Sequence, residues 1–165
     1  MAEFGLDEIF DLACTDRVDI SFLSFVQMSP RGEINMSFVG GDYDRPKVRL
    51  PGGAGSATLT PVSKRVLIWK TKHDKNSLVP QVAYRTTTAN PSKEFKVVTN
   101  LCTFVLRGGV LELESIHPYS SLEEVKANTG WDIVQAEVPF TPAPTAEELA
   151  ALEKVDPNRI RYVEF

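Results

Sequence analysis

The chain has 165 residues, of which 42% are hydrophobic and 24% charged, a composition that excludes intrinsic disorder for most of the chain. Eighteen Lys and Arg against 22 Asp and Glu give a formal net charge of −4, which argues against a nucleic-acid-binding protein. Cys14 and Cys102 form no metal-ligand or disulfide motif, and no signal peptide or membrane segment is evident. We therefore expect a cytoplasmic protein without a metal site. One domain over residues 1–165 is expected, with residues 138–165 as a proline-rich extension and C-terminal helix.

The N-terminal part predicts a helix followed by two strands. Apolar residues at helical spacing predict a helix over residues 6–13, with Cys14 as a small core residue on its apolar side. Alternating apolar residues predict strands over residues 18–26 and 34–38. Residues 40–55 have no periodicity, so they are predicted to be a long loop, and loops of this length are uncommon unless they are functional.

The remaining pattern alternates strands and helices. In chain order, we expect a helical turn over residues 57–63, a strand over 66–69, a second long loop over 71–93, a strand over 95–99, a hairpin over 104–113, and two helices after the capping-box residues Ser121 and Thr145. The continuous apolar run 66–69 is typical of a strand buried on both faces of a parallel or mixed sheet. The order predicts an α/β open sandwich with a largely parallel or mixed sheet.

Gly52, Gly53, Ala54 and Gly55 precede the helical turn and are the sharpest local feature. Small residues let a backbone approach a ligand closely and aim successive N–H groups at an oxyanion or a phosphate. The segment matches neither a P-loop nor a dinucleotide-binding turn. Two interpretations stay open, a ligand-binding loop and a tight glycine turn before a helix.

His73 follows the strand over residues 66–69, at the end of an α/β sheet where ligands usually bind. It is either a donor to an acyl or phosphate oxygen or a solvated loop histidine. The nearby basic residues can hold a polyanion or form a solvated face. They are Lys70, Lys72, Lys75 and Arg85. His117 is interpreted as structural.

Several segments carry a family resemblance that covers nearly the whole chain. They are GLDEIFDL (5–12), GGDYDRPKVRLPGGAG (40–55), HDK (73–75), VTNL (98–101), LESIHP (113–118) and NTG (128–130). In this order they resemble the B (beta) subunit of family I coenzyme A transferases. The branch is that of the glutaconate CoA-transferase B chain and of the beta subunit of the steroid ring-cleaving hydrolase.

The resemblance implies a CoA-transferase-like open sandwich that forms a homo- or hetero-oligomer, with an active site shared with an A-type subunit. Acyl-CoA is then a substrate, and no cofactor is permanently bound. The loop Gly52, Gly53, Ala54 and Gly55 would line the acyl-CoA pocket and offer N–H groups to the oxyanion. We expect the two long loops to meet at one pocket, so that His73 lies near the glycines and Lys72 or Lys75 meets a CoA phosphate.

The family's nucleophilic glutamate lies upstream of the helix that begins here near Gly5, and the only acid there, Glu3, is not in the matching context. We therefore expect a C-terminal part of a B subunit, or a naturally short one, and assign no catalytic residue. Transfer and hydrolysis of acyl-CoA thioesters both stay open. The alternative from another class is a non-catalytic CoA-binding or assembly subunit.

Overall fold

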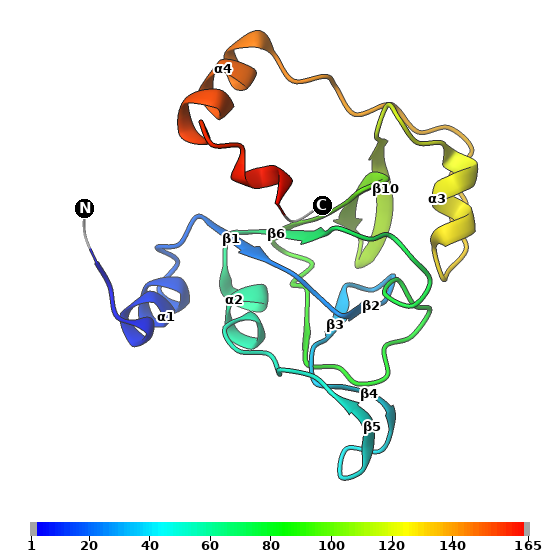
Figure 1. Ribbon diagram of the computed structural model, residues 1–165. Coiled ribbons are helices and arrows are strands. Elements are labelled where there is room, and N and C mark those ends of the chain that lie inside the picture. Colours follow the sequence, from blue (N-terminus) through cyan, green and yellow to red (C-terminus); the bar gives the residue numbers. More distant parts are fainter. Residues whose placement is uncertain (1–2, 164–165) are drawn as a thin grey trace.

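The computed structural model describes residues 3–163 (Figure 1). The helices are α1 (Leu6–Cys14), α2 (Ser56–Val62), α3 (Leu122–Asn128), α4 (Ala146–Val155) and the 3-10 helix η1 (Ile160–Tyr162). The strands are β1 (Ile20–Leu23), β2 (Gln27–Met28), β3 (Glu33–Asn35), β4 (Phe38–Gly41), β5 (Pro46–Arg49), β6 (Arg65–Lys70), β7 (Thr87–Thr88), β8 (Glu94–Thr99), β9 (Cys102–Arg107) and β10 (Val110–Ile116).

A five-stranded sheet in the order β1-β6-β8-β9-β10 forms the centre of the fold. The pairs β1–β6 and β6–β8 are parallel, whereas β8–β9 and β9–β10 are antiparallel. The predicted α/β fold with a mixed sheet is therefore confirmed. A smaller sheet, β2-β3-β7, and the β4–β5 hairpin complete the strands.

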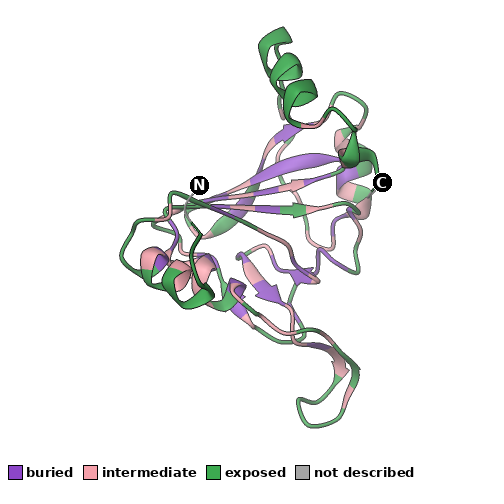
Figure 2. Ribbon diagram, turned by 60° about the vertical axis from the view of Figure 1, so that its left-hand side comes forward, coloured by how far each residue is buried: buried purple, intermediate pink, exposed green. Residues whose placement is uncertain are grey.

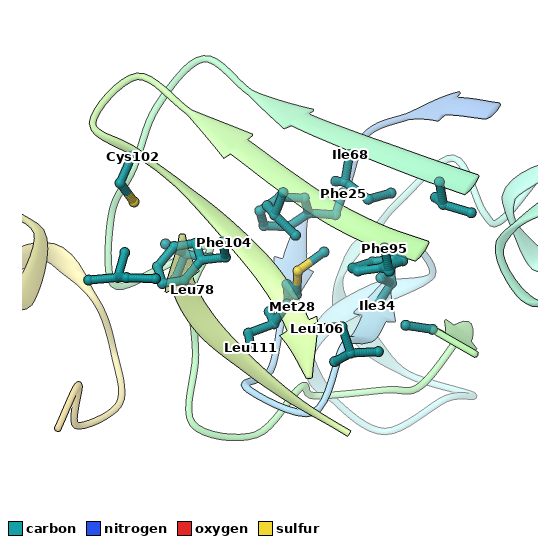
Figure 3. Close-up of a cluster of buried hydrophobic side chains, with 14 of the residues drawn as sticks. Phe25, Met28, Ile34, Ile68, Leu78, Phe95, Cys102, Phe104, Leu106 and Leu111 are labelled. Carbon is teal, nitrogen blue, oxygen red and sulfur yellow. The ribbon is translucent and has the colours of Figure 1, made fainter. Parts of the chain in front are cut away.

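The hydrophobic core lies on one face of the five-stranded sheet, where strand residues meet side chains from β2 and β3 (Figure 3). In β6, Val66 and Ile68 point into this core, whereas Trp69 is 40% exposed. The prediction that residues 66–69 are buried on both faces is therefore wrong. Among the described residues no second layer covers Trp69, and the strand's burial alternates as it does in any half-covered sheet.

Two other predictions are wrong. Residues 40–55 are not one loop, because β5 within them pairs with β4 in an exposed antiparallel hairpin. The glycines Gly40 and Gly41 have positive φ angles of 67° and 73° and interrupt the alternation that would have indicated a strand. Cys14 is exposed rather than part of the core, because Ala13 takes the buried position of α1.

The C-terminal helix α4 is present as predicted, and Thr145 caps it in a capping box with Glu148. None of its residues is buried, and Figure 2 shows the helix projecting away from the buried strands. No helix among residues 3–163 combines the length and the hydropathy that crossing a bilayer requires.

His73 is 5% exposed, so its interpretation as a solvated loop histidine is wrong. Its Nδ1 and Nε2 atoms lie 2.9 Å from the hydroxyls of Thr99 and Thr129, respectively. The Thr129 hydroxyl lies 2.7 Å from the Val125 carbonyl, whereas the Thr99 hydroxyl lies 3.2 Å from the Cys102 carbonyl. The shorter bond assigns the Thr129 proton to Val125, so Thr129 accepts from Nε2–H and the Thr99 hydroxyl donates to Nδ1. Burial lowers the pKa of His73 to about 4. The neutral ring therefore joins the end of β8 to the end of α3.

The two edges of the central sheet differ. Along β10, Leu113 N–H donates to Gln135 Oε1 at 2.7 Å, and Gln135 Nε2 donates back to the Leu113 carbonyl at 2.9 Å. Ile116 N–H donates to Pro139 O at 3.0 Å on the same edge. At the opposite edge, β6 is the only strand that pairs with β1 among the described residues. One edge is thus covered by the chain itself and the other is open to a further strand.

The buried histidine predicts a pH-dependent stability. Between pH 6.5 and about 4 the unfolded chain binds a proton at His73 that the folded chain does not, so stability falls as the pH falls through this window. The full effect is on the order of 3 kcal/mol. Urea unfolding at pH 7, 5.5 and 4 should show that His73→Gln lacks this part of the pH dependence. Parallel pH profiles of the two proteins would contradict the assignment.

The two hydrogen bonds between the Gln135 side chain and the Leu113 backbone should contribute to the stability of the fold. Gln135→Ala removes both hydrogen bonds to Leu113 and should lower the free energy of unfolding by about 1–2 kcal/mol. Gln81→Ala, at an exposed glutamine, is the matched control and should change it by less than about 0.5 kcal/mol. Thermal or urea unfolding measures both, and equal effects of the two substitutions would rule out the edge-covering role.

Candidate functional site

The glycine loop, residues 52–55, lies between β5 and α2. It contacts the turn between β3 and β4 through Met36 and the segment before β7 through Thr86. Gly52 N–H donates to the Met36 carbonyl at 2.8 Å. Thr86 Oγ1 accepts from Met36 N–H at 2.9 Å and lies 2.7 Å from Ser37 Oγ. A Cβ at Gly53 would lie only 2.9 Å from the Thr86 methyl group, so the loop passes close to this segment because residue 53 is glycine.

Asn35 fixes the segment to which the loop is bonded. Its side chain is fully buried and donates from Nδ2 to the Phe38 carbonyl at 2.7 Å and to Gln27 Oε1 at 2.8 Å. Its Oδ1 accepts from Ser37 N–H at 2.9 Å. Because these buried polar groups all find partners, they define one conformation of the turn between β3 and β4.

The backbone of the glycine loop leaves three successive N–H groups without an acceptor among the described residues. The φ angles of Gly52, Ala54 and Gly55 are 93°, 42° and −69°. Within residues 3–163, the N–H groups of Gly53, Ala54 and Gly55 donate no hydrogen bond. Successive N–H groups in a turn with left-handed residues form a concave anion-binding nest. A positive φ at a residue with a Cβ, as at Ala54, costs about 1–2 kcal/mol, and such strain is concentrated at functional sites.

An aromatic cluster with one cation lies beside the loop. The rings of Phe38, Tyr43 and Tyr84 have centroids 5.2 to 6.0 Å apart. The Arg49 guanidinium lies 5.0 Å from the Tyr43 ring centroid and 6.0 Å from that of Phe38. We call these four residues the hairpin platform. Sequence reasoning missed it, because Tyr84 comes from a distant segment and no spacing pattern connects it to Arg49.

The predicted basic group does not form one patch. Lys70 Nζ donates to the Phe25 carbonyl at 2.9 Å, and Lys72 pairs with Asp74 at 3.3 Å. Arg85 pairs with Glu33 at 3.5 Å. Lys75 is exposed and makes no ion pair within the described part of the chain. The structure therefore gives no support to a polyanion site made of all four.

The structure does not bring His73 to the glycine loop. Its polar and ring contacts are with Thr99, Asn100, Cys102, Phe104 and Thr129, and none of these residues is among those that contact the loop. Both ring nitrogens are also occupied, so donation to a ligand would require a hydrogen bond inside the protein to break. The contacts favour a positioning role, and ligand binding by His73 and Lys75 stays a prediction.

A separate cavity of about 320 Å³ opens at the carboxyl ends of β6 and β8. It is lined by Trp69, Lys70, Thr71, Val98, Thr99, Asn100, His117 and Tyr119. His117 is held there by bonds from Nε2 to the Thr99 carbonyl at 3.0 Å and between Nδ1 and Thr141 Oγ1 at 2.9 Å. This placement agrees with its interpretation as structural. The cavity contains no residue of the glycine loop.

No group of three or more His, Cys, Asp or Glu side chains is placed to hold a metal ion within residues 3–163. Cys102 is buried, and burial raises the pKa of its thiol to about 12. The thiol is therefore neutral at physiological pH and is a poor nucleophile.

Comparisons with solved structures confirm the fold. The decarboxylase AibA/AibB superposes with a TM-score of 0.88 at 29% identity, over 98% of this chain and 67% of that chain. IpdAB of Rhodococcus jostii RHA1 superposes with a TM-score of 0.86 at 24% identity, over 96% of this chain and 69% of that chain. Glutaconate coenzyme A-transferase of Acidaminococcus fermentans superposes with a TM-score of 0.77 at 20% identity, over 93% of this chain and 66% of that chain.

Sequence comparisons agree with the family predicted from the motifs. The B subunit of 3-oxoadipate CoA-transferase from Pseudomonas knackmussii is 35% identical, over 85% of this chain and 59% of that protein. The B subunit of glutaconate CoA-transferase from A. fermentans is 25% identical, over 85% of this chain and 58% of that protein. The chain thus spans less than two thirds of either curated relative. Because the family model for coenzyme A transferase matches residues 4–128, well over half of the chain, the chain belongs to the coenzyme A transferase family.

Proposed function

We propose that this chain is all or part of the B subunit of an enzyme that acts on acyl-CoA thioesters together with an A-type subunit. The observation that carries the proposal is the glycine loop, with three consecutive N–H groups that have no hydrogen-bond acceptor among the described residues. In this proposal the loop binds the carbonyl oxygen of the thioester. Support comes from two curated relatives that are B subunits of CoA-transferases.

The role proposed for the loop is to stabilise the negative charge that forms on the carbonyl oxygen of the thioester during the reaction. Attack by a nucleophile converts the carbonyl oxygen into an oxyanion, and N–H groups already aimed at it stabilise the charge without reorganisation. The donors of Gly53, Ala54 and Gly55 are held in place by the bond from Gly52 to Met36. The same loop serves transfer of CoA to a second acid and hydrolysis by water, because both pass through an oxyanion.

The nucleophile has to come from elsewhere. The residues shown to contact or hydrogen-bond the loop are Phe10, Met36, Ser56, Ala57, Thr58, Leu59 and Thr86, and none is a carboxylate, imidazole or thiol. The one hydroxyl that bonds the loop directly, that of Ser56, donates to the Gly53 carbonyl. This observation also favours the second candidate function, a CoA-binding or assembly subunit whose partner supplies all the chemistry. In both functions CoA enters as part of the substrate and is not a resident cofactor.

A partner is further supported by the open edge of β1 and by the exposed face of β6 that carries Trp69. The solved structure of the decarboxylase AibA/AibB, by its name, contains two components. A cytoplasmic location is part of the proposal, because Cys14 and Cys102 are both free thiols, as a reducing compartment would leave them.

A substitution at Gly52 tests whether the glycine loop binds the thioester, because a Cβ at this position would meet no protein atom within 4 Å. Gly52→Ala should weaken binding of butyryl-CoA to the 165-residue chain about tenfold or more, because the methyl group enters the space of the ligand. Calorimetric titration measures the affinity.

The matched control is Gly109→Ala in the β9–β10 turn. Gly109 has a similar φ of 82°, against 93° at Gly52, and the same open space around its Cβ position. Both substitutions should therefore cause a similar backbone strain and a similar drop in melting temperature, and only Gly52→Ala should lose affinity. Equal affinity of the two variants for butyryl-CoA would overturn the assignment of the loop.

A further inference from the structure

We propose that the cavity at the carboxyl ends of β6 and β8 binds a small aromatic carboxylate. Lys70 and Asn100 hold the carboxylate group, and aromatic side chains of the cavity wall pack on the ring. The glycine loop contributes no residue to this cavity, so the inference goes beyond the proposed function and is tested separately. It adds a second ligand site and a ligand class.

The cavity lies where open α/β sheets usually bind their ligands. β6 and β8 are parallel neighbours, and their last paired residues are Lys70 and Thr99. Ligands of such sheets bind in the crevice beyond the carboxyl ends of the strands. The volume of about 320 Å³ is at the lower end of the range for small-molecule sites, about 300 to 1,000 Å³. The expected ligand is therefore small.

Lys70 is an oriented cation that has no ion-pair partner among residues 3–163. Its Nζ donates to the Phe25 carbonyl at 2.9 Å and lies 5.3 Å from the centroid of the Phe25 ring. Asp74 pairs with Lys72 instead, at 3.3 Å. Burial lowers the pKa of Lys70, because its charge is partly removed from water without an anion beside it. An anion in the cavity would offset this cost and use N–H donors that the Phe25 carbonyl leaves free.

Asn100 supplies a second donor to the same cavity. Its Oδ1 accepts from the backbone N–H of His73 at 2.7 Å, which fixes the amide with its oxygen toward the protein. The Nδ2 group has no acceptor within the described part of the chain. No acidic side chain is among the residues that line the cavity. An ammonium and an amide N–H without a neighbouring acid favour an anion over a cation.

The wall of the cavity is aromatic. Trp69 is 40% exposed and Tyr119 is 76% exposed. The Tyr119 ring packs on His117, with centroids 5.6 Å apart. Both ring nitrogens of His117 already have partners within the protein, so this side chain offers the ligand its ring rather than a proton. A flat apolar ligand removes such aromatic surface from water and can stack on it, which is why the carboxylate should carry a ring.

The experiment is an amide NMR titration of the isotope-labelled 165-residue chain with phenylacetate. The Trp69 indole N–H and the Asn100 side-chain amide should shift, with a dissociation constant of about a millimolar. Phenylacetamide has the same shape without the charge, and acetate has the charge without the ring. Each should bind about tenfold more weakly than phenylacetate.

Two substitutions test the donors. Lys70→Met keeps the length of the side chain but removes its charge, so it should weaken phenylacetate about tenfold and leave phenylacetamide unchanged. Asn100→Asp keeps an oxygen to accept from His73 N–H and puts a negative charge in place of the donor, so it should abolish binding of phenylacetate. Lys154→Met, at an exposed lysine of α4, is the control for net charge and should bind like the parent.

Three results would overturn the inference. Phenylacetate that shifts no resonance of the cavity would leave its aromatic residues as a surface for a protein partner. Acetate or inorganic phosphate that binds as tightly as phenylacetate would mean that the ring contributes nothing. Parent-like affinity of both Lys70→Met and Asn100→Asp would remove the assigned donors. Melting curves verify folding, and Asn100→Asp carries the test if Lys70→Met is unfolded.

Discussion

The hydrogen bond of 2.8 Å from Gly52 N–H to the Met36 carbonyl decides where the glycine loop lies. It joins the end of the β4–β5 hairpin to the turn that follows β3. That turn is fixed by the fully buried Asn35, whose bonds to Gln27 and Phe38 allow a single arrangement. The proposed binding site therefore depends on a buried polar network more than on the large hydrophobic core.

A loop with three unused N–H groups and a left-handed alanine is not what stability alone would favour. The strain at Ala54, about 1–2 kcal/mol, has to be offset by well-satisfied structure elsewhere. The bonds of Asn35 and of His73, each with all its donors and acceptors used, supply such structure.

Features with local causes were predictable from the sequence. The caps at Ser121 and Thr145, the glycine turn at residues 108–109 and the glycine loop each depend on a few adjacent residues. Features with distant partners were not predictable. His73 is buried because the Thr99 hydroxyl donates to its Nδ1 and the Thr129 hydroxyl accepts from its Nε2–H, from positions 26 and 56 residues away. The β4–β5 hairpin was also missed, because β5 is mostly exposed and two glycines at the end of β4 interrupt any apolar alternation.

The most direct test of the central claim is an amide NMR titration of the isotope-labelled chain. Valeryl-CoA is compared with S-pentyl-CoA, a thioether that has the same chain but no carbonyl oxygen. The account predicts that the amide protons of Gly53, Ala54 and Gly55 move downfield with the thioester and not with the thioether. Amide resonances that stay unchanged, or that move equally with both compounds, would contradict binding of the thioester carbonyl by the glycine loop.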